Sequence, residues 1–355
     1  MKKIKKLKVG VIGLGAIGNT HVDAYIANAT AAEITAVCDM LPERVKTLGD
    51  KCGAQGRFND YRELLKSDVD AVSVCVGNTL HREVAVAALR AGKHVLLEKP
   101  MAMNAREAAE IVATAGRSRR VLQIGMVRRQ NGDVQAVRRM VANGEFGKIY
   151  HMRAVMIRRR GIPGMGGWFT NKAQSGGGPL IDLGVHWFDV AMHVSGLWKP
   201  TSVSAATYSN FTRDMRAYKY VSMWAGPPKL DGVCDVEDYA TGLVRFGREA
   251  TMSFEIAWAA NLPDQSYVEI AGEKAGVRLF ENAPLRILTE TKNHPADISP
   301  LIPDAGNTFQ SQARLFLAAC RGECPPAATG AEGLINMRLI DAVYRSAATG
   351  REVRV

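Results

Sequence analysis

A glycine-rich turn near the N-terminus constrains the fold of this chain more than any other stretch, because its glycines have the spacing Gly13-x-Gly15-x-x-Gly18. An apolar run over residues 7–12 precedes the turn, and a helical pattern over residues 16–28 follows it. In a strand–turn–helix unit, such glycines permit a sharp turn, a close approach of ligand to backbone, and close packing of the helix on the strand. Free N–H groups at the helix N-terminus then face the phosphates of a dinucleotide. We therefore expect the pyrophosphate of a cofactor to be bound by Gly13, Gly15, Ala16, Ile17 and Gly18.

A second apolar run, residues 33–38, ends in Asp39, which lies about twenty residues beyond Gly18, where a dinucleotide-binding fold places its ribose-binding carboxylate. An acid at this position accepts hydrogen bonds from the ribose hydroxyls of NAD and repels the 2′-phosphate of NADP. The pattern therefore predicts NAD as the cofactor. Arg44 keeps NADP open as the less favoured cofactor, because a nearby arginine tolerates that phosphate. The alternative is an incidental turn, with an acid that caps the helix beginning near Pro42.

The composition narrows the class of protein. The length of 355 residues is enough for two domains, and five lysines in the N-terminal tail contribute five of the +11 net charge, so we expect no nucleic-acid partner. No apolar run reaches the length of a membrane span and no secretory signal precedes the first strand, which predicts a cytoplasmic protein with no membrane partner. The six cysteines form no C-x-x-C pair or zinc-like group, so we expect thiols in a reducing compartment and no metal.

Strand and helix patterns alternate from residue 7 to residue 125. Apolar runs occur at 7–12, 33–38, 71–76, 94–97 and 121–125, and helical patterns lie between them at 16–28, 42–52, 79–91 and 104–117. This alternation implies right-handed crossovers and a parallel sheet that is covered on both faces. We therefore predict an α/β fold that begins with a Rossmann domain, a doubly wound parallel sheet over residues 1–126.

After residue 126 the pattern changes. A helix is expected over 133–143, and strand-like runs follow at 148–158, 201–209, 238–246, 250–258, 266–271 and 276–280. Segments 211–235 and 283–306 are rich in Gly, Pro and polar residues, which predicts irregular structure, and helical patterns at 307–321 and 330–348 close the chain. We predict an α+β domain over residues 127–355 with an open, mostly antiparallel sheet, whose closing helices can pack back on the first domain.

Polar residues follow two of the expected strands of the first domain. The run 71–76 leads into Gly77, Asn78 and His81, a loop that lies beside the ribose and nicotinamide of a dinucleotide in this fold. Capping of the next helix by Asn78 or Thr79 is the structural alternative. We expect all three loop residues to contact the cofactor.

The run 94–97 ends in Glu98-Lys99-Pro100, so it points a charged pair at the ligand crevice. Pro100 holds Lys99 in an extended conformation. A lysine there can hold a substrate hydroxyl and lower its pKa, whereas an ordinary Glu–Lys pair at a strand end is the alternative. We expect both Glu98 and Lys99 to lie next to the cofactor.

A second polar constellation lies in the stretch after Pro179, whose apolar residues predict a buried helix. Its polar exceptions, Asp182, His186, Asp189 and His193, fall within a stripe of roughly 60° on an α-helix. Such a stripe is costly when buried unless its members pair or face a wet cavity. The i, i+4 spacing of Asp182 and His186 suits a carboxylate that fixes the tautomer of a general base. Satisfied core histidines are the alternative, and we expect no metal because hydride transfer with a general base needs none.

Taken together, these features resemble the Gfo/Idh/MocA family of oxidoreductases, which includes glucose-fructose oxidoreductase and inositol dehydrogenase. The resemblance covers nearly the whole chain and rests on the glycine turn, Asp39, the stretch that ends in Glu98-Lys99-Pro100, and the pair Asp182-x-x-x-His186. One departure is Val76-Gly77-Asn78, where the family often has Thr-Pro-Asn. The resemblance implies a C-terminal substrate-binding domain whose sheet forms the interface of a homodimer or homotetramer.

The resemblance also implies roles for site residues. Lys99, Asp182 and His186 would surround the substrate carbon as catalytic groups, and Arg128 and Asp189 would contact substrate hydroxyls. In the implied reaction, a sugar or cyclitol loses a proton to His186 while Lys99 stabilises the developing alkoxide, and a hydride passes to NAD.

Trp168 is a further candidate, because an aromatic ring can cover the apolar face of a sugar; core packing is an equal alternative. Two other functions stay open for the whole chain. One is a relative that retains NAD and oxidises transiently in order to cleave or modify a glycoside. The other is a non-catalytic NAD(P)-binding sensor.

Overall fold

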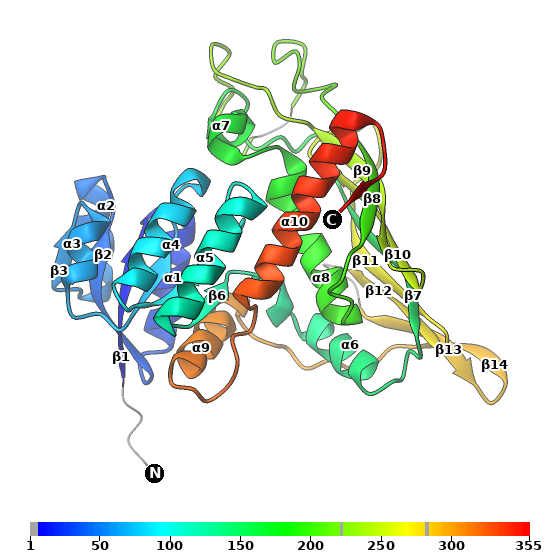
Figure 1. The fold of residues 1–355 in the computed structure, drawn as a ribbon, viewed down its shortest axis with the longest axis horizontal. Helices are drawn as coiled ribbons and strands as arrows, with labels where there is room; N and C mark the ends of the chain where they lie inside the picture. Colours follow the sequence, from blue (N-terminus) through cyan, green and yellow to red (C-terminus); the bar gives the residue numbers. More distant parts are fainter. Residues whose placement is uncertain (1–5, 221–222, 281–283) are drawn as a thin grey trace. The chain divides into compact units, whose positions relative to one another are not determined.

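The computed structural model describes residues 6–220, 223–280 and 284–355. The chain forms two units. One contains the residues up to Gln130 together with Ala305–Leu334, and the other contains Asn131–Asp304 together with Ile335–Val355. The segment Ala305–Leu334 therefore returns to the first unit after the chain has built most of the second (Figure 1).

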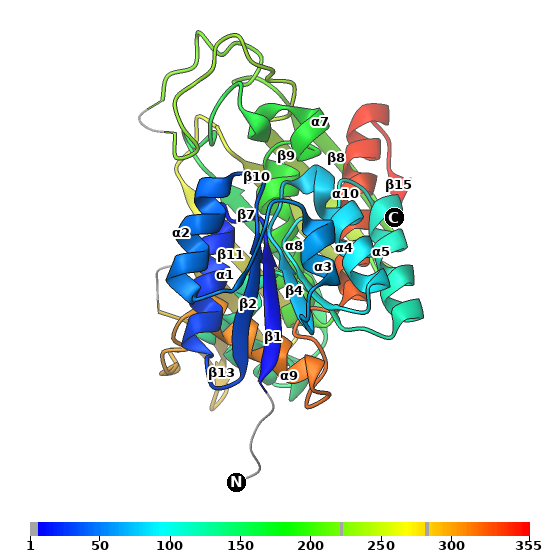
Figure 2. The ribbon, with the colours of Figure 1, turned by 90° about the vertical axis from the view of Figure 1, so that its left-hand side faces the viewer.

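Six parallel strands form the sheet of the first unit, in the order β3-β2-β1-β4-β5-β6. Its centre, with β1 between β2 and β4, faces the viewer in Figure 2. They are β1 (Leu7–Ile12), β2 (Ala32–Cys38), β3 (Gly56–Phe58), β4 (Ala71–Val74), β5 (His94–Leu97) and β6 (Leu122–Ile124). The helices are α1 (Ala16–Ala27), α2 (Pro42–Cys52), α3 (Tyr61–Lys66), α4 (His81–Arg90), α5 (Ala105–Ser118) and α9 (Thr308–Cys320). This order confirms the predicted Rossmann sheet and puts a topological switch point, where such sheets bind ligands, between β1 and β4.

The apolar pattern does not predict β3 and α3, because a three-residue edge strand and a helix of under two turns give little periodic signal. The core of this unit also takes in a distant segment. Phe316 and Leu317 of α9 belong to the same buried apolar cluster as Val22 and Tyr25 of α1. A C-terminal helix therefore completes the N-terminal unit.

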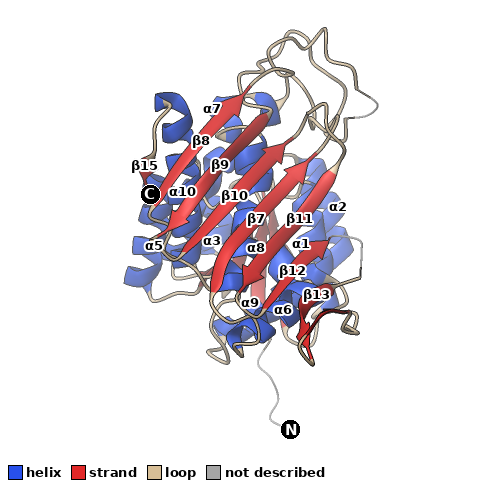
Figure 3. Cartoon of the chain, turned by 90° about the vertical axis from the view of Figure 1, so that its right-hand side faces the viewer, coloured by secondary structure: helices blue, strands red, loops and turns tan. Residues whose placement is uncertain are grey.

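Nine strands form the sheet of the second unit, in the order β14-β13-β12-β11-β7-β10-β9-β8-β15 (Figure 3). They are β7 (Ile149–Ile157), β8 (Ser202–Tyr208), β9 (Tyr239–Phe246), β10 (Ala250–Ala257), β11 (Gln265–Gly272), β12 (Ala275–Phe280), β13 (Arg286–Thr291), β14 (His294–Ile298) and β15 (Val353–Arg354). The helices are α6 (Gly132–Ala142), α7 (Lys172–Ser175), α8 (Val185–Ser195) and α10 (Gly330–Thr349), the last of which begins in the first unit. Pairing is antiparallel except between β7 and β10, so the expectation of a mostly antiparallel sheet is confirmed.

The prediction that residues 283–306 are irregular is wrong in part, because β13 and β14 form a hairpin there. Its two-residue turn is Lys292-Asn293, and both residues have positive φ, as a type I′ turn requires. A lysine is an unusual choice for that backbone conformation, which is why the turn carries a weak sequence signal. Among the described residues, no helix combines the length and the hydrophobicity that crossing a membrane demands.

Candidate active site

Close packing requires glycine at positions 13 and 18 of the turn, whereas the space beside Gly15 is open. Gly13 has φ +88°, and a Cβ on it would lie 2.4 Å from the Cys75 carbonyl oxygen. A Cβ on Gly18 would lie 1.9 Å from the carbonyl oxygen of Gly13. On Gly15 the nearest neighbour would be Arg44 Nη1, at 3.9 Å. The open position is thus the one at which a ligand must approach the backbone.

The N-terminus of α1 suits the pyrophosphate of NAD. Gly15 is its N-cap, so no side chain caps the helix, and its first turn contains no acidic residue. The backbone N–H groups of the first turn, which includes Ala16 and Ile17, have no intrahelical acceptor. The positive end of the helix dipole adds to their attraction for phosphate. These residues fit the cofactor that the fold implies.

Asp39 is oriented by the glycine turn itself. Its Oδ2 accepts a hydrogen bond from the Leu14 N–H at 2.7 Å, and its Oδ1 accepts one from the Leu41 N–H at 3.0 Å. Leu41 is the N-cap of α2, and no side chain caps that helix, which removes the alternative that Asp39 is a helix cap. Arg44 Nη1 lies 3.7 Å from Asp39 Oδ2. The acid and the arginine that are predicted to decide between NAD and NADP therefore form one ion pair beside the open Gly15 position.

The loop after β4 contains Gly77 and Asn78, and the ring of His81 contacts the backbone of this loop. His81 is buried, and its ring lies between two carbonyl oxygens, that of Pro100 at 2.6 Å from Nδ1 and that of Val76 at 3.0 Å from Nε2. Burial lowers the pKa of His81, so its neutral ring donates to one of them. Neither Asn78 nor Thr79 caps α4, whose N-cap is Leu80. The contribution of His81 is to join this loop to the Glu-Lys-Pro turn.

Glu98 is buried and takes part in a network that the sequence does not predict. Its Oε1 lies 2.9 Å from His21 Nε2, and His21 Nδ1 lies 3.1 Å from Ser73 Oγ, which Tyr25 Oη also contacts at 2.8 Å. Glu98 Oε2 accepts the Lys99 N–H at 3.2 Å. His21 lies three residues after Gly18 on α1, so the i, i+3 spacing is the signal by which it could have been found. The network connects α1, the helix that follows the glycine turn, to the backbone of Lys99.

Four groups of predicted residues follow the carboxyl ends of β1, β4, β5 and β6, which are parallel neighbours in the sheet. They are Gly13, the loop of Gly77 and Asn78, the half-buried Lys99, and the half-buried Arg128 in a short 3₁₀ turn (Val127–Gln130). Carboxyl ends of parallel strands share one edge of a sheet, so the first unit brings these positions to the ligand-binding edge.

In the second unit the helix after Pro179 is present, but its first turn is not the α-helical turn that the sequence predicts. Its first turn, Leu180–Gly184, is π-helical, and α8 follows from Val185. The rotation of 100° per residue therefore does not hold through Asp182, a correction to the uniform stripe. Short π-helical turns are frequent at functional sites. Asp182 Oδ2 accepts a hydrogen bond from Trp258 Nε1 at 3.2 Å, and both Asp182 and His186 are half-buried.

The distal half of the stripe is more deeply buried. Asp189 is 2% exposed and His193 is 6% exposed. Arg138 of α6 donates to His193 Nδ1 at 3.3 Å and also to its carbonyl oxygen. His193 thus helps to pack α6 on α8, which agrees with the core alternative for this residue.

Glu237, a residue that the sequence does not single out, contacts the glycines that precede Pro179. Its carboxylate accepts the Gly178 N–H at 3.0 Å, the Leu180 N–H at 3.2 Å and the Tyr344 hydroxyl at 2.9 Å. A Cβ on Gly177 would lie 2.0 Å from Tyr344 Oη. Burial raises the pKa of Glu237. This carboxylate anchors the turn that starts the helix of Asp182 and His186.

Trp168 lies in a short 3₁₀ turn (Trp168–Thr170) and is 43% exposed, so it is not a core residue. Among residues 6–220, 223–280 and 284–355, no group of three or more His, Cys, Asp or Glu side chains is placed to hold a metal ion.

Comparisons with known proteins find relatives that match both units of the chain. The family model described as "Oxidoreductase family, NAD-binding Rossmann fold" matches residues 7–126, and a GFO/IDH/MocA C-terminal domain model matches residues 134–278. The chain is 32% identical over 352 residues to D-glucoside 3-dehydrogenase of Escherichia coli, covering 98% of this chain and 97% of that protein. It is 29% identical to 1,5-anhydro-D-fructose reductase of Ensifer adhaerens over 98% of both chains. The structure of levoglucosan dehydrogenase with NADH and levoglucosan has the same fold, with a TM-score of 0.85 at 22% identity over 99% of this chain and all of that one.

Proposed function

Because the chain belongs to the Gfo/Idh/MocA family of NAD-binding oxidoreductases, we propose that it transfers a hydride between NAD and a secondary hydroxyl of a sugar, a sugar derivative or a cyclitol. One observation carries this proposal. The match to D-glucoside 3-dehydrogenase runs through both units, so it includes the phosphate-binding turn of the first and the Asp182–His186 helix of the second.

The cofactor is held by residues of the first unit. The Gly13–Gly18 turn binds the pyrophosphate, Asp39 accepts the ribose hydroxyls, and Arg44 neutralises part of the charge beside them. The end of the cofactor site that receives the nicotinamide is formed by Gly77, Asn78, His81, Glu98 and Lys99. NAD, when bound, supplies the hydride acceptor.

The acid–base chemistry is assigned to Lys99, Asp182 and His186. His186 takes the hydroxyl proton as general base, because an imidazole titrates near neutral pH. Asp182, which is oriented by the Trp258 N–H, stabilises the charge that develops on the ring. The Lys99 ammonium stabilises the developing alkoxide. Arg128, Asp189 and Trp168 are assigned to substrate binding.

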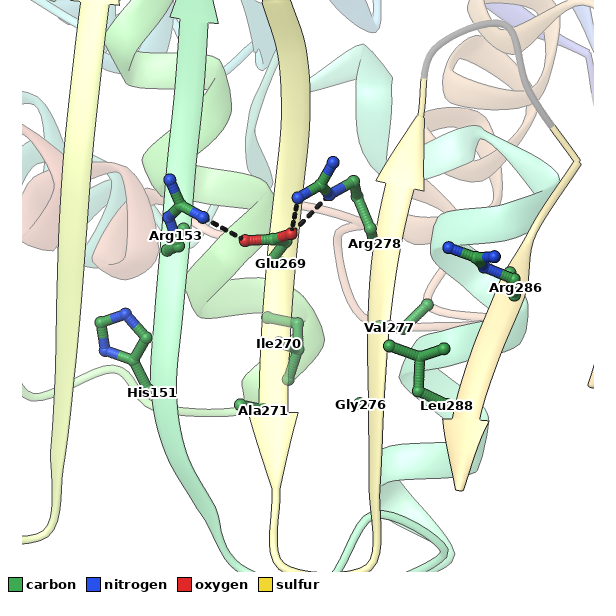
Figure 4. A pocket seen from close by; sticks show the side chains of 10 residues that line it. All are labelled: His151, Arg153, Glu269, Ile270, Ala271, Gly276, Val277, Arg278, Arg286 and Leu288. Atoms are coloured by element: carbon green, nitrogen blue, oxygen red, sulfur yellow. Dashed lines mark hydrogen bonds and ion pairs between the residues drawn. The ribbon is translucent and has the colours of Figure 1, made fainter. Parts of the chain in front are cut away.

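The second unit also supports an assembly through its sheet. α8 packs on one face of this sheet and α6 packs on α8, whereas no helix among the described residues of this unit packs on the other face (Figure 3). On that face a hollow of about 300 Å³ contains Glu269 between Arg153, at 3.0 Å, and Arg278 (Figure 4). Leu288, at its edge, is 46% exposed. We propose that two copies cover this face, giving a homodimer or homotetramer, and sedimentation equilibrium of the wild type and of Leu288→Glu tests it.

We assign the protein to the cytoplasm. All six cysteines are thiols, and Cys38, Cys75 and Cys320 are packed where burial raises the pKa of each thiol. Unpaired cysteines suit a reducing compartment.

The experiment that tests the function is an assay of NADH formation with a panel of glycosides, aldoses, sugar acids and cyclitols, repeated with NADP and in the reductive direction with keto-sugars. We expect one sugar class to react, with NAD preferred. Binding of NAD without turnover on any member in either direction would contradict the proposal and favour the sensor function. Lys99→Ala is the control, because its loss of activity excludes a contaminating dehydrogenase.

A further inference from the structure

Three aromatic side chains of the second unit form a partly exposed group, the aromatic shelf, made of Trp168, Phe169 and Trp224. The ring centroids of Trp168 and Phe169 are 3.7 Å apart with an interplanar angle of 32°. Phe169 meets Trp224 edge-on, at 4.9 Å and 71°. Trp168 is 43% exposed and Trp224 is 66% exposed. Contiguous apolar surface of this kind marks a ligand or interaction site more often than scattered exposed residues do.

The shelf is held by two loops that pair through their backbones. The Ala225 N–H donates to the Pro163 carbonyl and the Lys229 N–H donates to the Met165 carbonyl, both at 2.8 Å. A Cβ on Gly166 would lie 1.9 Å from the Lys229 carbonyl oxygen, so the loops approach as closely as glycine permits. Ala225 and Lys229 thus fix the loop of Trp224 to the loop of Trp168 and Phe169, so the three rings are preorganised for a ligand.

The shelf is joined to the helix that bears the proposed base. Phe169 packs edge-on against Trp258, with centroids 6.5 Å apart at 82°. Trp258 is fully buried, and its Nε1 donates to Asp182 Oδ2 at 3.2 Å. Phe169 and the buried Trp258 therefore connect the two exposed indoles to the carboxylate. A sugar that reaches Asp182 and His186 would have any attached ring in the vicinity of the shelf.

From this arrangement we propose that the aromatic shelf is a second subsite, which binds a ring attached to the sugar that is oxidised. The inference rests on the proposed function. The C–H groups on the face of a sugar ring carry slight positive charge and the face of an indole carries negative charge, so the two stack, and an aryl group packs there as well. The substrate class is thus glycosides that carry a sugar or aryl ring beyond the glycosidic bond, in preference to free monosaccharides.

The test compares kcat/KM for a disaccharide and an aryl glucoside with kcat/KM for methyl glucoside and glucose. It uses the wild type, Trp224→Ala, Trp224→Phe, and Tyr150→Ala as a matched control. Tyr150 is 53% exposed and lies at the opposite end of β7 from the loop that bears Trp168. Trp224 is largely exposed, so its removal leaves the fold intact.

We expect Trp224→Ala to lower kcat/KM for the ring-bearing glycosides about tenfold, with methyl glucoside unchanged within twofold. Trp224→Phe should restore most of the loss, and Tyr150→Ala should have no effect. An equal loss on every substrate, or no loss on any, would overturn the subsite.

Tryptophan fluorescence separates a failure of the subsite from a failure of the proposed function. Titration with the aryl glucoside should give a saturable change that Trp224→Ala abolishes, whether or not NADH forms. A saturable change without turnover supports the subsite and contradicts the dehydrogenase. Turnover with no change in fluorescence and no selectivity contradicts the subsite alone.

Discussion

Replacing His21 with leucine tests the buried network under the Glu-Lys-Pro turn. The His21 ring lies between Ser73 Oγ, at 3.1 Å, and Glu98 Oε1, at 2.9 Å, and the side chains of His21 and Glu98 are both buried. Leucine retains much of the apolar packing but donates no hydrogen bond. Glu98 Oε2 keeps the Lys99 N–H, so Oε1 is the atom that loses its donor.

The expected loss of stability is large. Removing one partner of a buried ion pair leaves the other charge uncompensated and costs about 3–5 kcal/mol. In a unit of this size each kcal/mol moves Tm by about 2–4 °C, so the transition of the first unit should fall by roughly 6–20 °C.

The loss should also depend on pH. Burial by itself lowers the pKa of His21, whereas its polar contacts raise it, and the net result is a pKa above the ordinary value of 6.5. Burial raises the pKa of the Cys75 thiol, which keeps it neutral, so we attribute the rise to the Glu98 carboxylate. Because the folded pKa exceeds the unfolded one, the pair contributes fully below pH 6.5, and its contribution is lost as pH rises through the raised pKa of His21. Wild type and variant should therefore converge in stability at alkaline pH.

Differential scanning calorimetry of the full chain measures these effects. The control is His94→Leu, which removes a half-buried ring of the same unit that accepts the Val121 N–H at 3.0 Å, and it should cost only about 0.5–1.5 kcal/mol. Adding Glu98→Gln to His21→Leu should recover stability, because the uncompensated charge is gone. A single variant as stable as the wild type, or a double variant less stable than the single, refutes the ion-pair reasoning.

Further predictions concern turnover, cofactor choice and the second unit. Lys99→Ala and His186→Ala should each lower kcat at least about 100-fold while the Kd of NADH, measured by fluorescence, stays within a few-fold; equal losses in both quantities would remove these roles. Asp39→Ala should raise the ratio of kcat/KM with NADP to that with NAD, since the repulsion of a 2′-phosphate is lost; an unchanged ratio excludes Asp39 from discrimination. Tyr344→Phe should cost about 1–2 kcal/mol in calorimetry, and Glu237→Ala should cost more, because three donors lose their acceptor; the reverse order would contradict the anchoring role.

Local pattern was a good guide to much of this protein. The spacing of three glycines and the alternation of apolar runs predicted the Rossmann sheet, because a strand, a tight turn and a helix N-terminus are all specified within a few residues. The helix after Pro179 was also foreseeable from its apolar composition, although its π-helical first turn was not. The hairpin of β13 and β14 was missed, because Lys292-Asn293 adopts a turn that this pair seldom signals.

What the sequence by itself determined is therefore most of the strand and helix pattern of each unit, the candidate cofactor-binding turn and the candidates for chemistry, all of which can be read from contiguous stretches. Only the tertiary structure revealed the hydrogen bonds that hold those candidates in place. They join residues that are distant in the sequence: His21 and Glu98, 77 residues apart, Glu237 and Gly178, 59 apart, and Trp258 and Asp182, 76 apart. It also showed that a polar-looking insertion carries part of an aromatic shelf. The physical reason is that periodicity reports which face of an element is buried, whereas the partner of a buried polar group is set by how distant elements pack.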